Sequence, residues 1–229
     1  MTYLVDIRIN NKAMYDWAKL IGLNNVDIGY IVHSLLCAAH GEFRLRPFRA
    51  YPNGDTTRVL GYSSVDSNRL QNERKAVAEP MVSNAIISET SKEMPDSWSV
   101  GSSYDFSALV VPLYQISKTK KQADVFLRSP DGSDRAEVYI KWLSDKISNA
   151  GDVANASMKM FKIEKVRRRG NSDASKPRKI GSGFTIPIVE IEGKITVNDN
   201  LAFSKMISGA VGRHAAFGMG AVFLRPTKG

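Results

Sequence analysis

The residues best suited to acid–base chemistry lie close together near the N-terminus, at Tyr30, His33, Cys37 and His40. On an α-helix, which turns 100° per residue, these four positions form one narrow stripe. An unperturbed imidazole titrates near about pH 6.5, so a histidine here can act as general acid or general base. Tyr30 and His33 are therefore the candidate catalytic residues. The alternative is that the stripe only borders a hydrophobic core, as tyrosine and histidine often do.

A helix has to position this stripe. Asn24, Asn25 and Asp27 offer N-caps ahead of it, and the pair His40-Gly41 is typical of a helix end. The intervening residues also include a broad apolar face, made of Ile31, Val32, Leu35, Leu36 and Ala39. This pattern predicts an amphipathic helix that runs to about Ala39 and turns the stripe away from the core.

The segment from Lys159 to Lys179 carries most of the excess positive charge. It contains two acidic residues and nine basic ones, which are Lys159, Lys162, Lys165, Arg167, Arg168, Arg169, Lys176, Arg178 and Lys179. Its second part is rich in Gly, Ser, Asn and Asp, which favours a loop at the tip of a hairpin. Such a segment is either a solvated surface or a basic finger that enters the groove of an RNA stem. The candidate RNA-binding residues are Lys165, Arg167, Arg168, Arg169, Lys176, Arg178 and Lys179.

A second unusual stretch runs from Ser208 to Leu224, where four glycines occur within a short span at Gly209, Gly212, Gly218 and Gly220. Glycines at such positions favour left-handed turns or the close approach of a ligand. Arg213 lies between the two glycine pairs, so backbone N–H groups and positive charge share one loop. This combination suits a polyanion. Gly212, Arg213 and Gly218 are accordingly candidate RNA-binding residues.

Composition agrees with a folded protein that binds a polyanion. The chain has 229 residues, 43% of them hydrophobic, and a formal net charge of +9. A basic excess favours nucleic acid through steering and counterion release. The single cysteine, Cys37, excludes an intrachain disulfide. With no long apolar run and no signal-peptide pattern, we expect a soluble, cytoplasmic protein without membrane contact.

The sequence gives little support to metal-dependent, nucleotide-binding or serine-hydrolase chemistry. Three histidines and one cysteine, without His-x-His or Cys-x-x-Cys spacing, predict no metal site and no cofactor. The sequence has no Walker loop and no Gly-x-Ser-x-Gly elbow. The aromatic octapeptide of single-strand RRM domains is also missing, which favours structured RNA as the partner.

The first half of the chain is predicted to have the element order βαββαβ. Tyr3 to Ile9 alternates apolar and polar residues, as a half-buried strand does. The further elements expected here are the helix described above, strands over 42–50 and 57–63 with a turn at Asn53-Gly54, a helix over 67–78 and a strand over 82–88.

The second half repeats this order after a serine- and glycine-rich linker, Pro95 to Ser103. It is expected to contain a strand over 104–116, a helix over 134–147, hairpin strands over 157–166 and 184–197, a helix over 201–208 and a strand over 221–224. The predicted fold class is therefore α+β, with two tandem ferredoxin-like or RRM-like domains at residues 1–98 and 104–229.

Several of these segments resemble one known family, the CRISPR-associated endoribonucleases that cut repeat RNA into guides (the Cas-six family), and its E subtype above all. Tyr30-Ile31-Val32-His33 is similar to the Tyr-x-x-His of the family's first helix. The glycine-rich stretch is similar to its C-terminal loop, Gly-x-Gly-x5-Gly-x-Gly, with Ala210 in place of the first glycine. Residues 189–200 and 134–147 resemble the segment before that loop and the family's Ala-Trp-Leu helix.

The resemblance implies a metal-independent endoribonuclease that acts on CRISPR repeat hairpins without a cofactor. The ribose 2′-OH would attack the adjacent phosphate and leave a 2′,3′-cyclic phosphate and a 5′-OH. His33 would serve as general base or acid, and Tyr30 would orient the phosphate or the 2′-OH. The implied partners are CRISPR repeat RNA and the other subunits of an effector complex, of type one-E or a type four relative.

The sequence departs from the family at one important position. Some relatives carry a lysine one turn beyond the histidine, where this chain has Ala38. His40, Arg44 or Arg46 are the candidates to replace it. This departure favours a rival function, a non-cleaving subunit that binds the repeat hairpin. An unrelated basic RRM-like protein is a more distant alternative.

Overall fold

The computed structural model of the chain describes residues 1–116, 122–167 and 183–227. The chain folds into two compact units. The N-terminal unit contains Met1–Met94 together with Lys165–Phe184 and Ala216–Gly218, and the C-terminal unit contains Pro95–Glu164, Thr185–Ala215 and Met219–Gly229. The N-terminal unit is thus completed by two short segments from the second half of the sequence.

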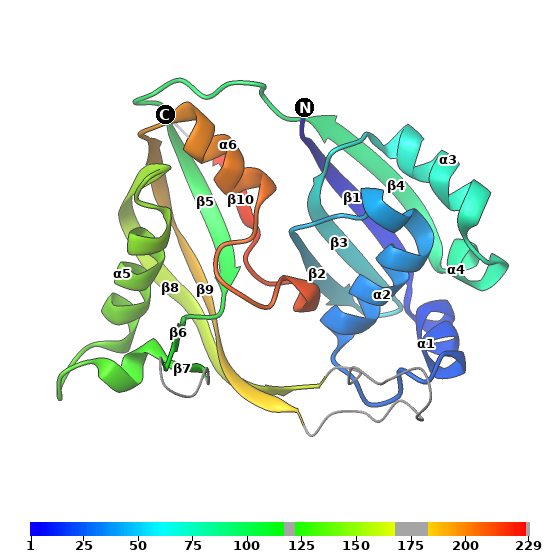
Figure 1. Ribbon diagram of the computed structural model, residues 1–229, viewed down its shortest axis with the longest axis horizontal. Coiled ribbons are helices and arrows are strands. Elements are labelled where there is room, and N and C mark those ends of the chain that lie inside the picture. The colour runs from blue at the N-terminus through cyan, green and yellow to red at the C-terminus, as the bar shows by residue number, and fades with distance from the viewer. Residues whose placement is uncertain (117–121, 168–182, 228–229) are drawn as a thin grey trace. The chain divides into compact units, whose positions relative to one another are not determined.

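The N-terminal unit is a four-stranded antiparallel sheet of strand order β2-β3-β1-β4, with helices on one face (Figure 1). Its elements are β1 (Tyr3–Asn10), α1 (Asn11–Leu20), α2 (Ile28–His40), a 3-10 turn (Gly41–Phe43), β2 (Phe48–Asn53), β3 (Thr56–Ser63), α3 (Ser67–Val77), α4 (Pro80–Ala85) and β4 (Ile86–Glu93). Alternate residues of β1, which are Val5, Ile7 and Ile9, are fully buried and meet the apolar face of α2 in one core.

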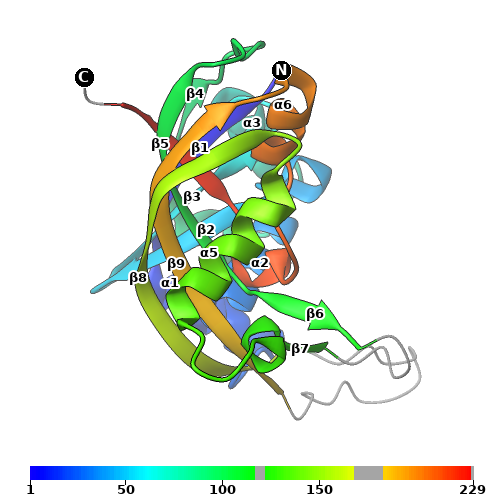
Figure 2. The same cartoon turned by 90° about the vertical axis from the view of Figure 1, so that its left-hand side faces the viewer.

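The C-terminal unit has a second four-stranded sheet, of order β10-β5-β9-β8. Figure 2 shows α5 and α6 on one face of this sheet. Its elements are β5 (Ser103–Val110), β6 (Leu113–Gln115), β7 (Gln122–Asp124), a 3-10 turn (Val125–Arg128), α5 (Arg135–Ile147), β8 (Gly151–Val166), β9 (Phe184–Val197), α6 (Asn200–Ser208), a 3-10 turn (Ala215–Phe217) and β10 (Val222–Pro226). The rings of Trp98, Tyr104 and Phe203, whose centroids lie 5.0–6.1 Å apart, attach α6 to β5.

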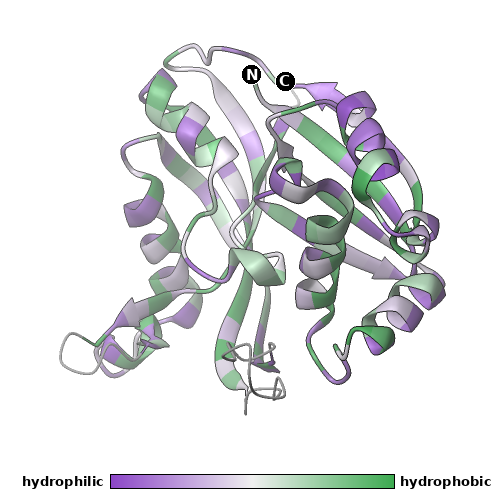
Figure 3. Cartoon of the chain, turned by 45° about the vertical axis from the view of Figure 1, so that its right-hand side comes forward, coloured by the Kyte–Doolittle hydropathy of each residue, from purple (hydrophilic) through white to green (hydrophobic). Residues whose placement is uncertain are grey.

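Both sheets place the first and third strands of the unit at the centre, in the order fourth, first, third, second. This is the strand order of a ferredoxin-like βαββαβ unit, so the predicted α+β fold class is confirmed. In Figure 3, hydrophobic residues gather where helices lie against the sheets, and hydrophilic residues lie on the solvent-facing sides of the helices. This is the two-layer packing that such a pattern predicts.

Asn and Asp residues set the helix starts. At five helices the side chain of the N-cap residue accepts a hydrogen bond from a backbone N–H of the first turn. These N-caps are Asn10, Asp27, Asp66, Asp134 and Asp199. Of the three N-caps that the sequence offers for the helix of Tyr30 and His33, the structure uses Asp27, whose Oδ1 accepts from the N–H of Gly29 at 2.8 Å.

Three element predictions are wrong and one helix was missed. The strand expected over 82–88 is α4 followed by β4, because Pro80 fits the first turn of a helix. The strand expected over 42–50 begins only at Phe48, after a 3-10 turn. Pro112 ends the ladder of the strand expected over 104–116, which divides into β5 and β6. The helix α1, with Met14, Trp17 and Ala18 buried, was not predicted.

The longest helices in the described part of the chain, α2 and α5, have 13 residues each. A helix needs about 20 apolar residues to cross a bilayer. None of the described helices is long and apolar enough to do so.

One buried cluster of polar side chains joins α2 and α3 to the edge strand β4. The side chains of His40 and Glu89 are both 0% exposed, and His40 Nε2 lies 2.5 Å from Glu89 Oε1. Arg74 donates to Glu89 Oε2 through Nε at 3.2 Å and Nη2 at 3.0 Å. Burial would raise the pKa of Glu89, but the hydrogen bonds from His40 and Arg74 outweigh it and leave that pKa below its usual range.

Replacing Glu89 with glutamine is therefore expected to lower the free energy of unfolding at neutral pH by about 3–5 kcal/mol, because Arg74 would lose its buried charge partner. A lowered carboxyl pKa contributes stability above the pKa of the unfolded chain, and this is lost as pH falls through the folded pKa. The difference between wild type and Glu89→Gln should thus shrink in acid.

Urea unfolding at several pH values measures this difference. The control is Asp145→Asn, which removes an exposed pair with Lys141 and should change the unfolding free energy by less than about 1 kcal/mol. Equal midpoints for Glu89→Gln and wild type at neutral pH would contradict the role of the buried cluster.

Candidate active site

Helix α2 presents its polar stripe as the sequence predicts, with one exception. Ile31, Val32, Leu35, Leu36 and Ala39 are buried on its core side. Tyr30, His33 and Cys37 are half-buried on another side of the helix. His40, the fourth member of the predicted stripe, is instead fully buried.

The imidazole of His33 lies between an aromatic ring and a thiol. Its ring is parallel to that of Phe48 in β2, with 2° between the planes and 6.4 Å between the centroids. Its Nε2 lies 3.8 Å from the Sγ of Cys37, one turn further along the helix. The ring of Tyr30 lies 6.3 Å from it on the preceding turn. These three groups border the ring of His33, and the side chain stays partly open to solvent.

A short segment of the glycine-rich stretch packs against the start of α2. The ring of Phe217 lies 5.7 Å from that of Tyr30, and Phe184 meets Phe217 edge-on at 5.9 Å. The backbone carbonyl of Phe217 approaches Gly29 so closely that a methyl group there would overlap it. Gly29 therefore lets Phe217 reach the helix and support Tyr30.

Gly218 completes this contact. It adopts a positive φ of 78°, which favours glycine, and it is buried. An added Cβ would lie 3.1 Å from the ring of Phe48, the ring that is parallel to His33. The structure thus gives Gly218 a packing role next to the candidate catalytic residues. An RNA contact through Gly218 stays a prediction.

Charge and burial act together on the titratable groups of this site. Burial, helped by the positive charges of Arg44 and Arg46, lowers the pKa of His33 below its ordinary value. Burial raises the pKa of the Cys37 thiol despite the same two arginines. At neutral pH the site therefore favours a neutral imidazole, which can accept a proton, beside a protonated thiol.

The surroundings of His40 show that it cannot replace the lysine of the relatives. It is fully buried and its Nε2 is engaged by Glu89. The interpretation of His40 as a possible catalytic group is therefore wrong, because burial against β4 closes it off from a substrate.

Arg44 and Arg46 remain as candidates to replace that lysine. Arg46 is exposed, and Arg44 is half-buried, with Nη1 donating to the carbonyl of Gly41 at 3.0 Å. The Nε of Arg44 is buried without a hydrogen-bond partner among the described residues. Both charges act on His33, so a cation is near the candidate site even though Ala38 lacks one.

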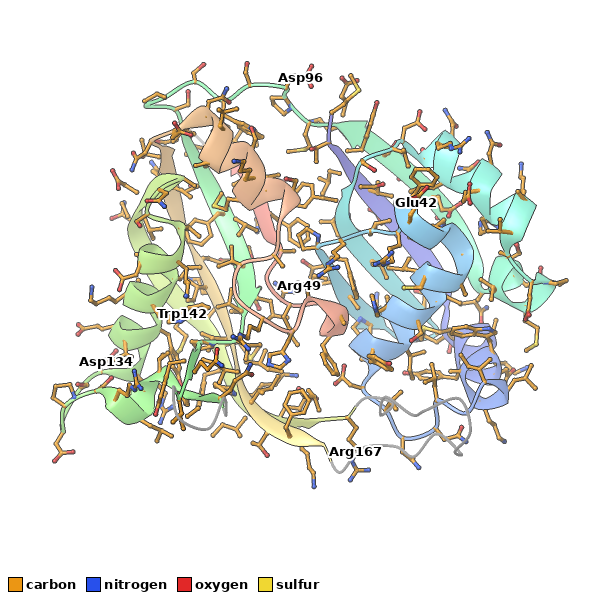
Figure 4. The ribbon with its side chains drawn as sticks, viewed as in Figure 1. Glu42, Arg49, Asp96, Asp134, Trp142 and Arg167 are labelled. Carbon is orange, nitrogen blue, oxygen red and sulfur yellow. The ribbon has the colours of Figure 1, made fainter. Side chains whose placement is uncertain are left out.

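The part of the basic segment from Lys165 onward belongs to the same unit as α2. Lys165 and Arg167 are exposed at the end of β8, and the carbonyl of Arg167 accepts a hydrogen bond from the N–H of Asp27 at 3.3 Å (Figure 4). The basic segment therefore meets the N-cap of α2 at Arg167. The other predicted RNA-binding residues of this segment lie outside the described residues, namely Arg168, Arg169, Lys176, Arg178 and Lys179.

Gly212 and Arg213 lie in the C-terminal unit. Gly212 has a φ of 81°, and an added Cβ would lie 3.0 Å from the ring of Trp142 on α5 (Figure 4). Arg213 is exposed and donates to Gln115 Oε1 at 3.0 Å. The loop is held by Gly220, whose carbonyl accepts from Val211 and whose N–H donates to Leu109. These hydrogen bonds tie the loop to β5, and it carries an exposed arginine.

The sequence-based interpretation missed Gly29, Phe48 and Phe217. Gly29, in the first turn next to Tyr30, is a signal that could have been noticed. Glycine weakens a helix, so its presence there suggests that another part of the chain approaches closely. Phe48 and Phe217 meet α2 through contacts far apart in the sequence, for which no local pattern exists. Among the described residues, no group of three or more His, Cys, Asp or Glu side chains could hold a metal ion.

Comparison with known proteins agrees with this fold. The family model described as CRISPR associated protein matches residues 2–226. Among curated proteins, none matches the sequence.

Solved structures of low sequence identity match over nearly the whole chain. Cse3 of Thermus thermophilus bound to an RNA representing a pre-cleavage complex has a TM-score of 0.64 at 15% identity, covering 98% of this chain and 99% of that one. Cas6e of Escherichia coli K-12 has a TM-score of 0.61 at 19% identity, covering 99% and 100%. These structures share the fold of this chain. Because the family model spans almost every residue, the chain belongs to the CRISPR associated protein family.

Proposed function

We propose that this protein is a metal-independent endoribonuclease that cleaves the repeat hairpins of CRISPR transcripts. The observation that carries the proposal is His33 itself, a half-buried imidazole with a lowered pKa, bordered by Phe48 and Cys37 beside Tyr30 and two arginines. A neutral imidazole in such a position can remove a proton at neutral pH. Family membership and the shared fold with an RNA-bound endoribonuclease support RNA as the substrate.

In the proposed reaction, His33 accepts the proton of the ribose 2′-OH at the cut site. The 2′-oxygen then forms a bond to the adjacent phosphorus, and the bond from phosphorus to the 5′-oxygen breaks. The 5′-oxygen takes up a proton from water and leaves as a hydroxyl, while His33 returns its proton to solvent, so that the products are a 2′,3′-cyclic phosphate and a 5′-OH. Tyr30 orients the phosphate, and Arg44 or Arg46 offsets its growing negative charge in place of the missing lysine.

The hairpin is proposed to be held by the basic segment from Lys165 onward and by the exposed Arg213, and to stay bound after cleavage as part of an effector complex. A structure described as a CRISPR RNA-guided surveillance complex contains a chain of the same fold, with a TM-score of 0.59 at 12% identity. The direct experiment incubates the purified full chain with the repeat hairpin of the CRISPR array beside its gene and looks for a single cut.

A second candidate function is a hairpin-binding subunit that does not cleave. The observation in its favour is Ala38, which is half-buried on α2 and carries no charge where some relatives carry lysine. Binding of the hairpin without any cut product, with His33 intact, would favour this function.

Replacing Arg44 with glutamine tests the proposed cation. Without this charge the pKa of His33 should rise toward its ordinary value, so the acidic limb of the pH–rate profile, where His33 becomes protonated, should move to higher pH. The maximal rate should also fall by about 10-fold to 100-fold through lost transition-state stabilisation.

The matched control is Arg58→Gln, which removes an exposed arginine of the same unit that pairs with Asp6 and should leave the profile in place. Single-turnover rates across the pH range measure both effects. If Arg44→Gln leaves the limb and the maximal rate unchanged, Arg44 is not the cation of this site.

Replacing Arg167, Arg168 and Arg169 together with alanine is expected to weaken hairpin binding and its salt dependence. Each lost phosphate contact should reduce the slope of log affinity against log salt by up to about 0.7–0.9. Binding assays at several salt concentrations measure the slope. An unchanged slope would mean that these arginines are only solvated.

A further inference from the structure

The face of the C-terminal sheet that points away from α5 and α6 carries a polar hollow of about 330 Å³. The ring of Tyr104 packs against Phe203 of α6, so its neighbour Asp105 points to the opposite face. Asp105 lies directly across from Arg225 on one neighbouring strand and from Lys194 on the other. All four strands line the hollow, through Arg225, Asp105, Glu192, Lys194, Asn155 and Lys159.

The charges of this hollow are largely free to act on a ligand. Lys159, Lys194 and Asp105 form no ion pair among the described residues, although Asp105 and Lys194 face each other. Glu192 Oε1 lies 3.6 Å from Arg225 Nη2, and the Arg225 side chain is 72% exposed, so that this contact is weak. The hollow therefore offers three cations and two carboxylates from rigid strands.

This mixture of cations and carboxylates should favour some phosphate-bearing ligands over others. Three cations attract a phosphate, while the two carboxylates repel a bare one. Carboxylates accept hydrogen bonds from ribose hydroxyl groups, as they do in dinucleotide sites. A phosphate that carries a ribose satisfies both sets of groups. Inorganic phosphate satisfies only the cations, and a deoxyribose phosphate lacks the 2′-OH that a carboxylate could accept from.

The hollow offers no surface for a nucleobase to stack on. The aromatic residue of its described lining, Phe106, is 3% exposed. Single-strand binding through base stacking needs an exposed aromatic ring. Recognition here would therefore read the sugar and the phosphate and would not depend on the base.

We propose that this hollow is a ribonucleotide site in which Lys159, Lys194 and Arg225 bind the phosphate and Asp105 and Glu192 accept from the ribose hydroxyls. The ligand is either a free ribonucleotide or one nucleotide of a single-stranded RNA. The site is built within the C-terminal unit and does not depend on cleavage at His33.

The test uses the full chain, with fluorescent oligoriboadenylate and oligodeoxyadenylate of equal short length, and AMP as a competitor. Wild type should bind the ribose form about tenfold more tightly than the deoxyribose form. The Lys159→Ala/Lys194→Ala variant should bind the ribose form at least about tenfold more weakly. Asp105→Asn, with its fold checked by urea unfolding, should narrow the difference between the two sugars.

The control variant is Lys141→Ala, which removes an exposed lysine on α5 and should change neither affinity. Displacement of the oligonucleotide by AMP would identify a free ribonucleotide as sufficient, and failure of AMP to displace it would identify single-stranded RNA. Either result supports the site. No measurable binding, equal affinity of wild type for both sugars, or an equal loss in Lys141→Ala would overturn it.

Cleavage of the repeat hairpin is followed in parallel, because a matching loss of cleavage in the double variant would assign these lysines to the hairpin instead.

Discussion

Replacing His33 with alanine is expected to slow cleavage of the repeat hairpin by about 100-fold or more, because the reaction loses a positioned proton acceptor. Hairpin affinity should stay within a few-fold of wild type, since none of the basic residues proposed to hold the RNA is changed. Single-turnover kinetics with enzyme in excess separate the two quantities, because they report the chemical step without product release.

The fold should tolerate this change. His33 is half-buried and contacts Phe48 and Cys37 at the border of the core, whereas the fully buried positions of α2 are Val32, Leu35 and Leu36. Alanine at position 33 therefore leaves no large cavity. The urea midpoint of the variant should stay close to that of wild type.

Ser34→Ala provides the matched control on the same helix. The hydroxyl of Ser34 donates to the carbonyl of Tyr30 at 2.9 Å and is half-buried, but it is not part of the proposed reaction. The control should cleave at close to the wild-type rate. A normal single-turnover rate for His33→Ala would contradict the catalytic role of His33, and the non-cleaving function would then be favoured.

The sequence predicted those parts of the fold and site that depend on local patterns. Tyr30 and His33 are separated by one helical turn, so their common orientation follows from helix geometry alone. The strand order in both sheets is the one expected for the predicted βαββαβ units. Apolar alternation in the sequence marked the central strands β1 and β9.

Contacts between distant residues were not predictable in this way. His40 shares the periodicity of His33, but its burial depends on Glu89, 49 residues further along the chain. Helix α1, by contrast, was missed although its signals are local, because Asn10 caps it and the buried Met14, Trp17 and Ala18 lie at helical spacing. The supporting rings of Phe48 and Phe217 become neighbours of α2 only when the chain has folded.

The most direct test of the proposed reaction is cleavage of the repeat hairpin in EDTA, with two substrates that differ only by 2′-OH or 2′-H at the cut site. The attacking group is the 2′-OH, so the deoxyribose substrate should bind equally well and give no product. The proposed reaction uses no metal ion, so the ribose substrate should be cut in EDTA at the rate seen with magnesium.

Mass spectrometry of the products completes this measurement. The proposed reaction predicts a 2′,3′-cyclic phosphate on the upstream fragment and a 5′-OH on the downstream fragment. Cleavage of the deoxyribose substrate, a 5′-phosphate on the downstream fragment, or a reaction that stops in EDTA and resumes with magnesium would contradict it.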